Sequence, residues 1–174
     1  EAFAQNSIIC TAPSKTFNLA GLQVSNIIIP NEGLRKRFIE EMHKAAIGGL
    51  NIMALTACQA AYEEGEEWLE ELKSYLHGNL NFVRRFLKEK LPQIKLVEPE
   101  GTYLIWLDFR GLGLSNEDLE DFIVNKARLW LNAGEMFGRE GAGFQRMNIA
   151  CPRAILEQAF QRLEEAINCL SREA

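Results

Sequence analysis

The chain has 174 residues, 47% apolar and 25% charged, and nineteen basic against twenty-four acidic side chains leave a net charge of −5. This composition excludes a wholly disordered or collagen-like chain, and the acidic balance removes any overall attraction to nucleic acid or an anionic membrane. Apolar runs such as residues 7–10 and 27–30 are far too short to span a bilayer. We therefore expect one large domain, or one domain with an appendage, and neither a nucleic-acid nor a membrane partner.

The first residues of the chain lack the features of a signal peptide. It begins at Glu1 and reaches a strand-like apolar segment within ten residues, without the charged and apolar regions of a signal peptide. We expect it to be part of a longer protein.

Scattered cysteines suit a reducing, cytoplasmic compartment, and their spacing forms no zinc half-site. The histidines, His43 and His77, lie in helical segments among charged neighbours, so no metal site is expected. The cysteines are Cys10, Cys58, Cys151 and Cys169.

Two β-rich runs, residues 7–10 and 23–29, open the chain. They bracket residues 11–21, a segment rich in turn-forming side chains. The pattern predicts a loop between two buried strands.

Three helices are expected next. The first follows the capping residue Asn31 and ends at the glycine pair 48–49. The second covers residues 51–63, and the third covers 66–91 after a break at Gly65. The third carries a continuous apolar stripe, which favours core packing, with a partner-helix role as the alternative.

The second half of the chain changes character, because strands and helices now alternate. A capping-box pattern at Ser115 and Asp118 marks one helix start. The pattern predicts an α+β layer in which helices cover one face of a sheet. The expected elements are strands at 95–97 and 102–109, a helix from 115 to about 126, strands at 128–131 and 144–150, and a C-terminal helix from Pro152.

Lys15 lies just past the first apolar strand, ahead of an aromatic residue and a glycine. Partial burial would depress the pKa of such a lysine, because it disfavours the ammonium form. A neutral amine condenses with a carbonyl as a Schiff base. From the residues alone, Lys15 is equally a loop lysine whose ammonium stays in solvent.

Arg146 lies in a strand whose alternation puts Phe144, Arg146 and Asn148 on one face. An arginine at mid-strand beside an aromatic is well placed to bind a carboxylate through two hydrogen bonds. The alternative is an edge-strand arginine that points to water. Residues 132–143 lead into this strand and contain four glycines, which predict a mobile or tightly turned loop.

Together these segments resemble one enzyme family in their order as well as in their residues. Residues 14–21 resemble the cofactor-lysine motif of the fold-type I pyridoxal-phosphate enzymes, the class I/II aminotransferase family. Residues 101–108, 132–138 and 144–148 resemble its small-domain strand, its loop and its substrate-carboxylate strand. The matching segments occur in the same order as in the family over nearly all 174 residues. Within the family, the chain most resembles the cystathionine β-lyase-like branch known as MalY/PatB.

The resemblance implies the C-terminal part of an α/β, pyridoxal-phosphate-dependent transferase-like fold, with an α+β small domain of two to four strands and covering helices. Residues 1–50 would be a remnant of the large cofactor-binding domain, 51–91 the linking helices and 92–174 the small domain. In the family, the aspartate at the pyridine nitrogen and the aromatic on the ring precede the lysine motif by many residues. Only fourteen residues precede Lys15, so we expect this chain alone to bind cofactor weakly and to catalyse nothing measurable.

The resemblance also implies residue roles. Lys15 would form the aldimine with pyridoxal 5'-phosphate and then remove the substrate α-proton, while Arg146 would bind the α-carboxylate. Ser14 would contact the cofactor phosphate, and Arg153 is a weaker candidate near the site. Gln23 stands where many aminotransferases of the family carry a phosphate-binding arginine. This departure weakens an aminotransferase assignment and is compatible with the β-lyase branch.

The expected function is a pyridoxal-phosphate-dependent carbon–sulfur β-lyase that acts on an amino acid and releases a thiol, pyruvate and ammonia. Two alternatives stay open: a class I/II aminotransferase, and a non-catalytic helical interaction module built on the long acidic-faced helix. By resemblance, the full-length protein is expected to be a homodimer.

Overall fold

The computed structural model describes residues 3–173, so Glu1, where the chain begins, lies outside them. The chain divides into two compact units, one ending at Leu72 and the other beginning at Lys73. The division falls inside the long helix α3 (Glu66–Lys90), which contributes to both units. The three-part division expected from the sequence stays a prediction.

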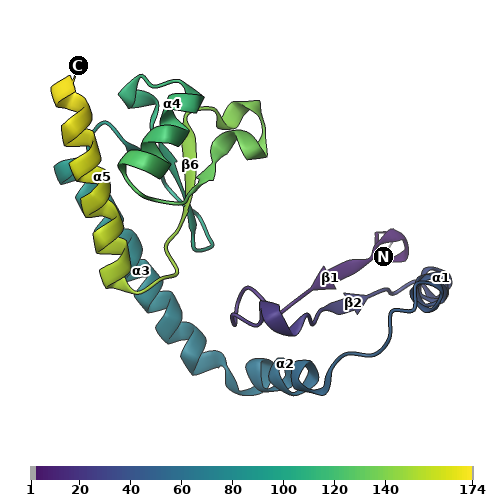
Figure 1. Ribbon diagram of the computed structural model, residues 1–174. Coiled ribbons are helices and arrows are strands. Elements are labelled where there is room, and N and C mark those ends of the chain that lie inside the picture. The colour runs from purple at the N-terminus through teal and green to yellow at the C-terminus, as the bar shows by residue number, and fades with distance from the viewer. Residues whose placement is uncertain (1–2, 174) are drawn as a thin grey trace. The chain divides into compact units, whose positions relative to one another are not determined.

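The first unit contains a hairpin of two short strands. After a 3-10 turn η1 (Ala4–Asn6), β1 (Ile9–Thr11) pairs antiparallel with β2 (Asn26–Ile28) (Figure 1). The expected loop joins them and contains a 3-10 turn, η2 (Ala20–Leu22). The expected burial of the strands is wrong for the described residues, since Ile9 and its partner Ile28 are 47% and 50% exposed. The physical reason is that a two-stranded ribbon cannot bury its own faces.

Two capped helices follow in the same unit and begin where expected. They are α1 (Glu32–Lys44) and α2 (Ile52–Glu64). The first ends at Lys44 and not at the glycine pair 48–49, because Ala46 already adopts a left-handed φ of 54°. The side-chain oxygens of Asn31 and Asn51 each accept a hydrogen bond from the backbone N–H three residues on, at 2.9 and 2.8 Å. The Asn51 amide also donates to the backbone carbonyl of Leu22 at 3.2 Å. The start of α2 is thereby joined to the loop between the strands.

The second unit is built on a four-stranded antiparallel sheet in the order β3-β4-β6-β5. Its strands are β3 (Lys95–Val97), β4 (Leu104–Asp108), β5 (Asn132–Ala133) and β6 (Phe144–Asn148). The strand β6 therefore lies between two neighbours. As the alternation predicted, Gln145 and Met147 are buried on the opposite face from Arg146.

The strand expected at residues 128–131 does not form. It follows a helix that begins as α4 (Asn116–Asp121) and ends in a π-helical turn, η4 (Phe122–Lys126). Arg128 has a left-handed φ of 54°, and the N–H of Leu129 donates back into this helix at 2.9 Å. The backbone of these residues therefore closes the helix instead of pairing in the sheet.

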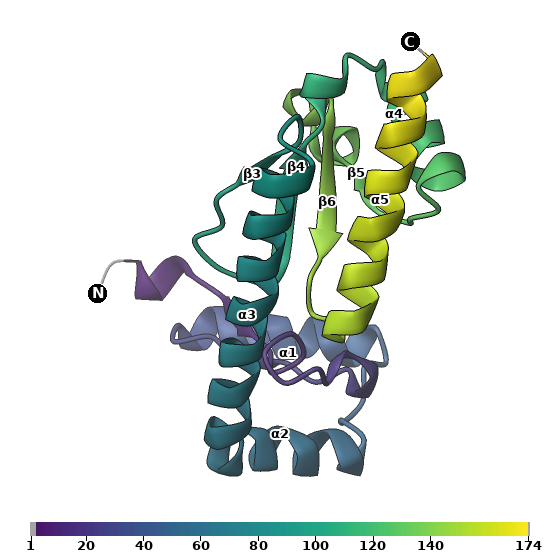
Figure 2. The same ribbon diagram turned by 90° about the vertical axis from the view of Figure 1, so that its left-hand side faces the viewer.

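Helices α3 and α5 (Arg153–Glu173) cover one face of the sheet (Figure 2). Fully buried Phe160 of α5 meets the rings of Phe82 and Phe86 of α3 at 5.8 and 5.4 Å. The expected α+β layer, with helices on one face, is confirmed. The core residues between the layers include Val83, Leu87, Ile105, Leu107, Met147, Leu156 and Leu163.

A buried asparagine connects α3 to the turn after β6. The amide of Asn79 donates to the carbonyls of Ile149 and Cys151 at 2.8 and 3.0 Å. Its oxygen accepts from Nε of Arg153 at 2.8 Å. This single side chain thus satisfies backbone groups where the chain leaves the sheet and enters α5. Across residues 3–173, no helix combines the length and the apolar character needed to cross a membrane.

Candidate functional site

Lys15 lies in a tight turn of the loop between β1 and β2. Backbone hydrogen bonds run from Phe17 to Pro13 at 2.9 Å and from Leu19 to Ser14 at 3.0 Å. The Lys15 side chain is exposed and has no hydrogen bond or ion pair within the described residues. The partly buried environment considered for this lysine is not provided by these residues, and the solvent-facing alternative describes it here.

Phe17 anchors the lysine turn to the junction of α2 and α3. Its ring packs edge-on against Tyr62 at 5.9 Å and stacks on Trp68 at 6.1 Å. Gly65 makes room for the ring and for the end of α2, since a Cβ at this position would lie 2.7 Å from the Phe17 ring and would overlap the backbone carbonyl of Ala61. The break predicted at Gly65 therefore has a second purpose, because it fixes the position of the loop that carries Lys15.

Two further sequence candidates lie in the same unit. Ser14 is half-buried, and its carbonyl is the acceptor that closes the turn. Gln23 has a left-handed φ of 56° and caps η2 through its backbone N–H. The roles expected for these two side chains stay predictions.

Arg146 lies on β6, opposite Trp106 of β4 and Asn132 of β5. Its Nη2 donates to the side-chain oxygen of Asn132 at 2.9 Å, and its Cζ lies 4.5 Å from the ring centre of Phe137. Nε is buried and has no hydrogen-bond partner within the described residues. The edge-strand alternative is wrong, because Arg146 is half-buried on an interior strand.

This geometry suits an anion. A buried N–H without a partner is costly, and a carboxylate satisfies it through a charge-assisted hydrogen bond. The Phe137 ring that stacks under Arg146 also lines a cavity of about 430 Å³ together with Trp106 and Phe144. The described residues therefore hold the Arg146 guanidinium in a fixed orientation, with one N–H unpaired, next to the Phe137 ring that lines the cavity.

The glycine-rich loop before β6 is tightly turned. It contains two 3-10 turns, η5 (Gly134–Phe137) and η6 (Arg139–Gly141). The backbones of Gly134 and Gly141 are in contact, and a Cβ on either would overlap the carbonyl of the other. This close contact holds Phe137 under Arg146, so the loop is part of the arginine site.

Arg153, the weaker candidate, has structural partners. Besides the bond from its Nε to Asn79, its Cζ lies 5.3 Å from the ring centre of Phe82. Its backbone N–H donates to the Tyr75 hydroxyl at 2.7 Å. These contacts hold the start of α5 against α3.

The sequence candidates are divided between the two units. Lys15 and Ser14 belong to the first, and Arg146 and Arg153 to the second. Sequence reasoning missed Asn132 and Phe137, although both lie in the glycine-rich segment already singled out. Nowhere in residues 3–173 do three or more histidine, cysteine, aspartate or glutamate side chains gather as metal ligands.

The chain belongs to the aminotransferase class I and II family, whose model matches residues 3–163. Its similarity to individual members is substantial. It is 43% identical over 166 residues to cystathionine beta-lyase PatB of Bacillus subtilis, with 95% of this chain and 43% of that protein covered. It is 32% identical over 163 residues to protein MalY of Escherichia coli, with 93% and 42% covered.

A solved structure shares the fold. Cystalysin from Treponema denticola, which contains a pyridoxal 5'-phosphate cofactor, matches with a TM-score of 0.89 and 37% identity. The match covers 97% of this chain and 43% of that one. The expected family and fold class are confirmed, and the chain spans less than half the length of these relatives.

Proposed function

We propose that the protein containing this chain is a pyridoxal-phosphate-dependent carbon–sulfur β-lyase that acts on an amino acid such as cystathionine. The observation that carries the proposal is the 43% identity, over 95% of the chain, to a protein named as a cystathionine beta-lyase. The residue roles below are part of the proposal and are supported by the geometry of each unit.

The side chains fit the cofactor. Lys15 presents a primary amine that has no other partner among the described residues, which is the group an aldehyde cofactor requires. Ser14, the preceding residue, offers a hydroxyl to the cofactor phosphate. When bound, pyridoxal phosphate supplies an electron sink for the pair released at the substrate α-carbon.

Arg146 binds the substrate α-carboxylate through its unpaired N–H groups, including the buried Nε. Asn132 and Phe137 fix the plane of the guanidinium, so little conformational freedom is lost on binding. Lys15 Nζ accepts the substrate α-proton once the carboxylate is held. In the lyase outcome the carbon–sulfur bond then breaks, the thiolate leaves with the bonding pair, and hydrolysis gives pyruvate and ammonia.

The test is made on the full-length protein with L-cystathionine, by measuring pyruvate and free thiol. Lys15→Ala is expected to lower kcat at least about a hundredfold, as removal of an acid–base group does. Arg146→Gln is expected to raise KM about tenfold or more. The control is Lys36→Ala, an exposed lysine of α1 paired with Glu32. Full activity in Lys15→Ala would contradict the role of Lys15, and a wild type that forms neither pyruvate nor thiol would favour a non-catalytic interaction module.

The second candidate is an aminotransferase, since the family description covers that activity. Gln23, at the position of the family's phosphate-binding arginine, weighs against it. The two outcomes separate by product, because an aminotransferase transfers the amino group to a keto acid without releasing a thiol.

The same proposal includes a cytoplasmic homodimer with the three-part domain division given above. The four cysteines are all free thiols in the structure, which suits a reducing compartment. Light scattering on the full-length protein tests the dimer, and a monomer would overturn that part.

A further inference from the structure

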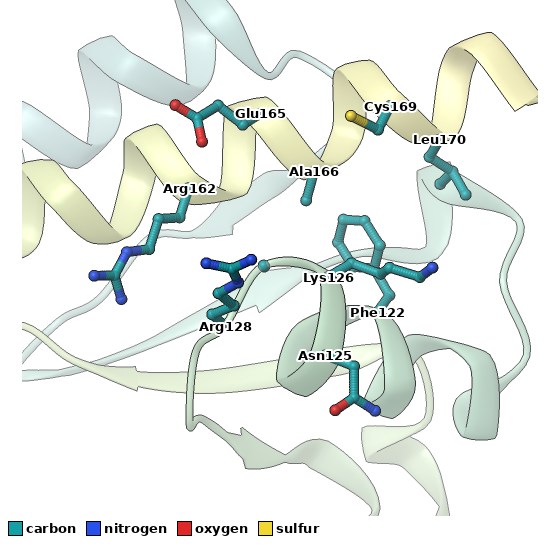
Figure 3. A pocket seen from close by; sticks show the side chains of 10 residues that line it. Phe122, Asn125, Lys126, Arg128, Arg162, Glu165, Ala166, Cys169 and Leu170 are labelled. Carbon is teal, nitrogen blue, oxygen red and sulfur yellow. The ribbon is translucent and has the colours of Figure 1, made fainter.

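A cavity of about 450 Å³ lies in the second unit, between the π-helical turn η4 and helix α5 (Figure 3). Three cationic side chains line it. Lys126 and Arg128 come from the end of η4 and the residues after it, and Arg162 comes from α5. None of these residues belongs to the proposed lyase site.

These three cations are not neutralised by the rest of the unit. Within the described residues none of them has a hydrogen bond or an ion pair. Two other arginines of the unit do have carboxylate partners, since Arg84 pairs with Glu98 and Arg110 pairs with Asp108. Arg85 has no such partner among the described residues, but it lies outside the cavity. Free positive charge therefore gathers at one cavity of a chain whose net charge is −5.

The backbone before the cavity is unusual in two ways that position Arg128. The N–H of Ala127 donates to the carbonyl of Phe122, five residues back, at 2.8 Å, which is the bond of a π-turn. Arg128 then adopts a left-handed φ of 54°, a conformation that side chains other than asparagine or aspartate rarely take. π-Turns of this kind occur frequently at functional sites.

The floor of the cavity is apolar. Phe122 and Ala166 are 3% and 7% exposed, and Leu170 is half-buried beside them. Figure 3 shows the guanidinium groups of Arg128 and Arg162 on one side of the Phe122 ring and the Lys126 ammonium on the other. The cavity thus offers two guanidinium groups at one end and a small, mostly buried apolar floor beside them.

We propose that this cavity binds a small organic phosphate, a phosphomonoester with an aromatic or similarly flat apolar body. Two guanidinium groups match the oxygens of a phosphate in pairs, and the apolar floor of Phe122, Ala166 and Leu170 contacts the apolar body. The three cations and the single lining carboxylate, Glu165, leave two net positive charges. A phosphomonoester near pH 7 carries almost two negative charges, so it fits better than a monocarboxylate.

The experiment is a calorimetric titration of phenyl phosphate into the full-length protein with its cofactor site filled and all free pyridoxal phosphate removed by gel filtration, because free pyridoxal phosphate is itself an aromatic phosphomonoester and would compete for the cavity. One saturable site is expected. Inorganic phosphate, which has only the anionic group, and phenol, which has only the aromatic ring, are each expected to bind at least about tenfold more weakly than phenyl phosphate.

The variants are Arg128→Asn, because asparagine tolerates the left-handed backbone, and Arg162→Gln. Each is expected to weaken phenyl phosphate binding about tenfold. The matched control is Arg85→Gln, an exposed arginine of α3 outside the cavity, which is expected to bind as the wild type does. Lys126→Gln is the second variant if thermal melting shows that either arginine variant is not folded.

Two results would overturn the proposal. One is the absence of a saturable site in the wild type. The other is an equal loss of affinity in Arg85→Gln and the cavity variants, which would mean that general charge attracts the probe. Lyase activity plays no part in this readout, so the proposal stands or fails independently of the proposed function.

Discussion

Asn132 accepts a hydrogen bond from Nη2 of Arg146, 2.9 Å away, and the two residues lie directly opposite each other on strands β5 and β6. The pairing of the two-residue strand β5 with β6 thus fixes the position of the Asn132 side-chain oxygen beside Arg146. An arginine oriented in this way presents the same N–H groups to every ligand molecule.

Asn132→Ala is expected to raise the KM of the full-length protein for cystathionine about three- to tenfold with a smaller change in kcat, because the guanidinium loses one hydrogen bond and its fixed plane. Steady-state kinetics measure this split. Asn168→Ala, at an exposed position of α5, serves as the control. A fall in kcat at unchanged KM would contradict a positioning role for Asn132.

Gly65→Ala is expected to loosen the turn that carries Lys15. The added Cβ would overlap the backbone carbonyl of Ala61 and lie 2.7 Å from the Phe17 ring, so the last turn of α2 and the ring packed on Tyr62 and Trp68 must shift apart. Hydrogen exchange at residues 13–19 should become faster, since the amides of Phe17 and Leu19 depend on that turn. Gly49→Ala, where an added Cβ meets nothing within 4 Å, should leave the exchange unchanged.

Asn79→Ala is expected to lower the free energy of unfolding of the second unit by about 2 to 4 kcal/mol, because the buried carbonyl of Ile149, the part-buried carbonyl of Cys151 and the Arg153 Nε lose their partner. Urea denaturation followed by circular dichroism gives the value. Asn81→Ala on the same helix removes one hydrogen bond from Arg84 and should cost less than about 1 kcal/mol. Equal losses in the two variants would contradict the special position of Asn79.

The Arg110 guanidinium lowers the pKa of Asp108 through two hydrogen bonds of 2.8 and 2.9 Å. A carboxyl with a depressed pKa stabilises the fold above its ordinary pKa, and this stabilisation disappears as the pH falls through the folded-state pKa. The pH-dependent part of the stability advantage of the wild type over Arg110→Gln should therefore disappear as the pH falls below about 4.

The comparison is made by urea midpoints between pH 7 and pH 3. A constant difference is expected to remain at low pH, since Arg110 also lies 4.7 Å from the ring centre of Phe144. In Arg85→Gln the difference from the wild type should be independent of pH. A wild-type advantage that grows on acidification would contradict the assignment.

The helices and the longer strands were predictable from local patterns. Asn31 and Asn51 cap the helices that their sequence positions indicate, and alternation along residues 144–148 correctly separates Arg146 from the core. The strand expected at 128–131 is wrong because the backbone N–H of Leu129 bonds back into the preceding helix. Neither a π-turn nor a left-handed arginine has a signature in composition.

The roles of the candidate site residues stay predictions, and only their surroundings can be compared with the sequence. The motifs name Lys15 and Arg146, yet the partners of Arg146 come from a loop whose path depends on the contact of Gly134 with Gly141. The burial expected for Lys15 could not be judged from neighbours in sequence, because burial depends on residues distant in the chain.

The π-turn at 122–126 amounts to one extra residue inserted into an ordinary α-helix. Removing one residue from this turn would restore regular helical bonding and rotate the chain that follows by about 100°. Arg128 would then leave the side of Arg162, although no side chain of the cavity had been replaced. A one-residue deletion here should therefore weaken anion binding to the cavity as much as a neutral substitution at Arg128 does.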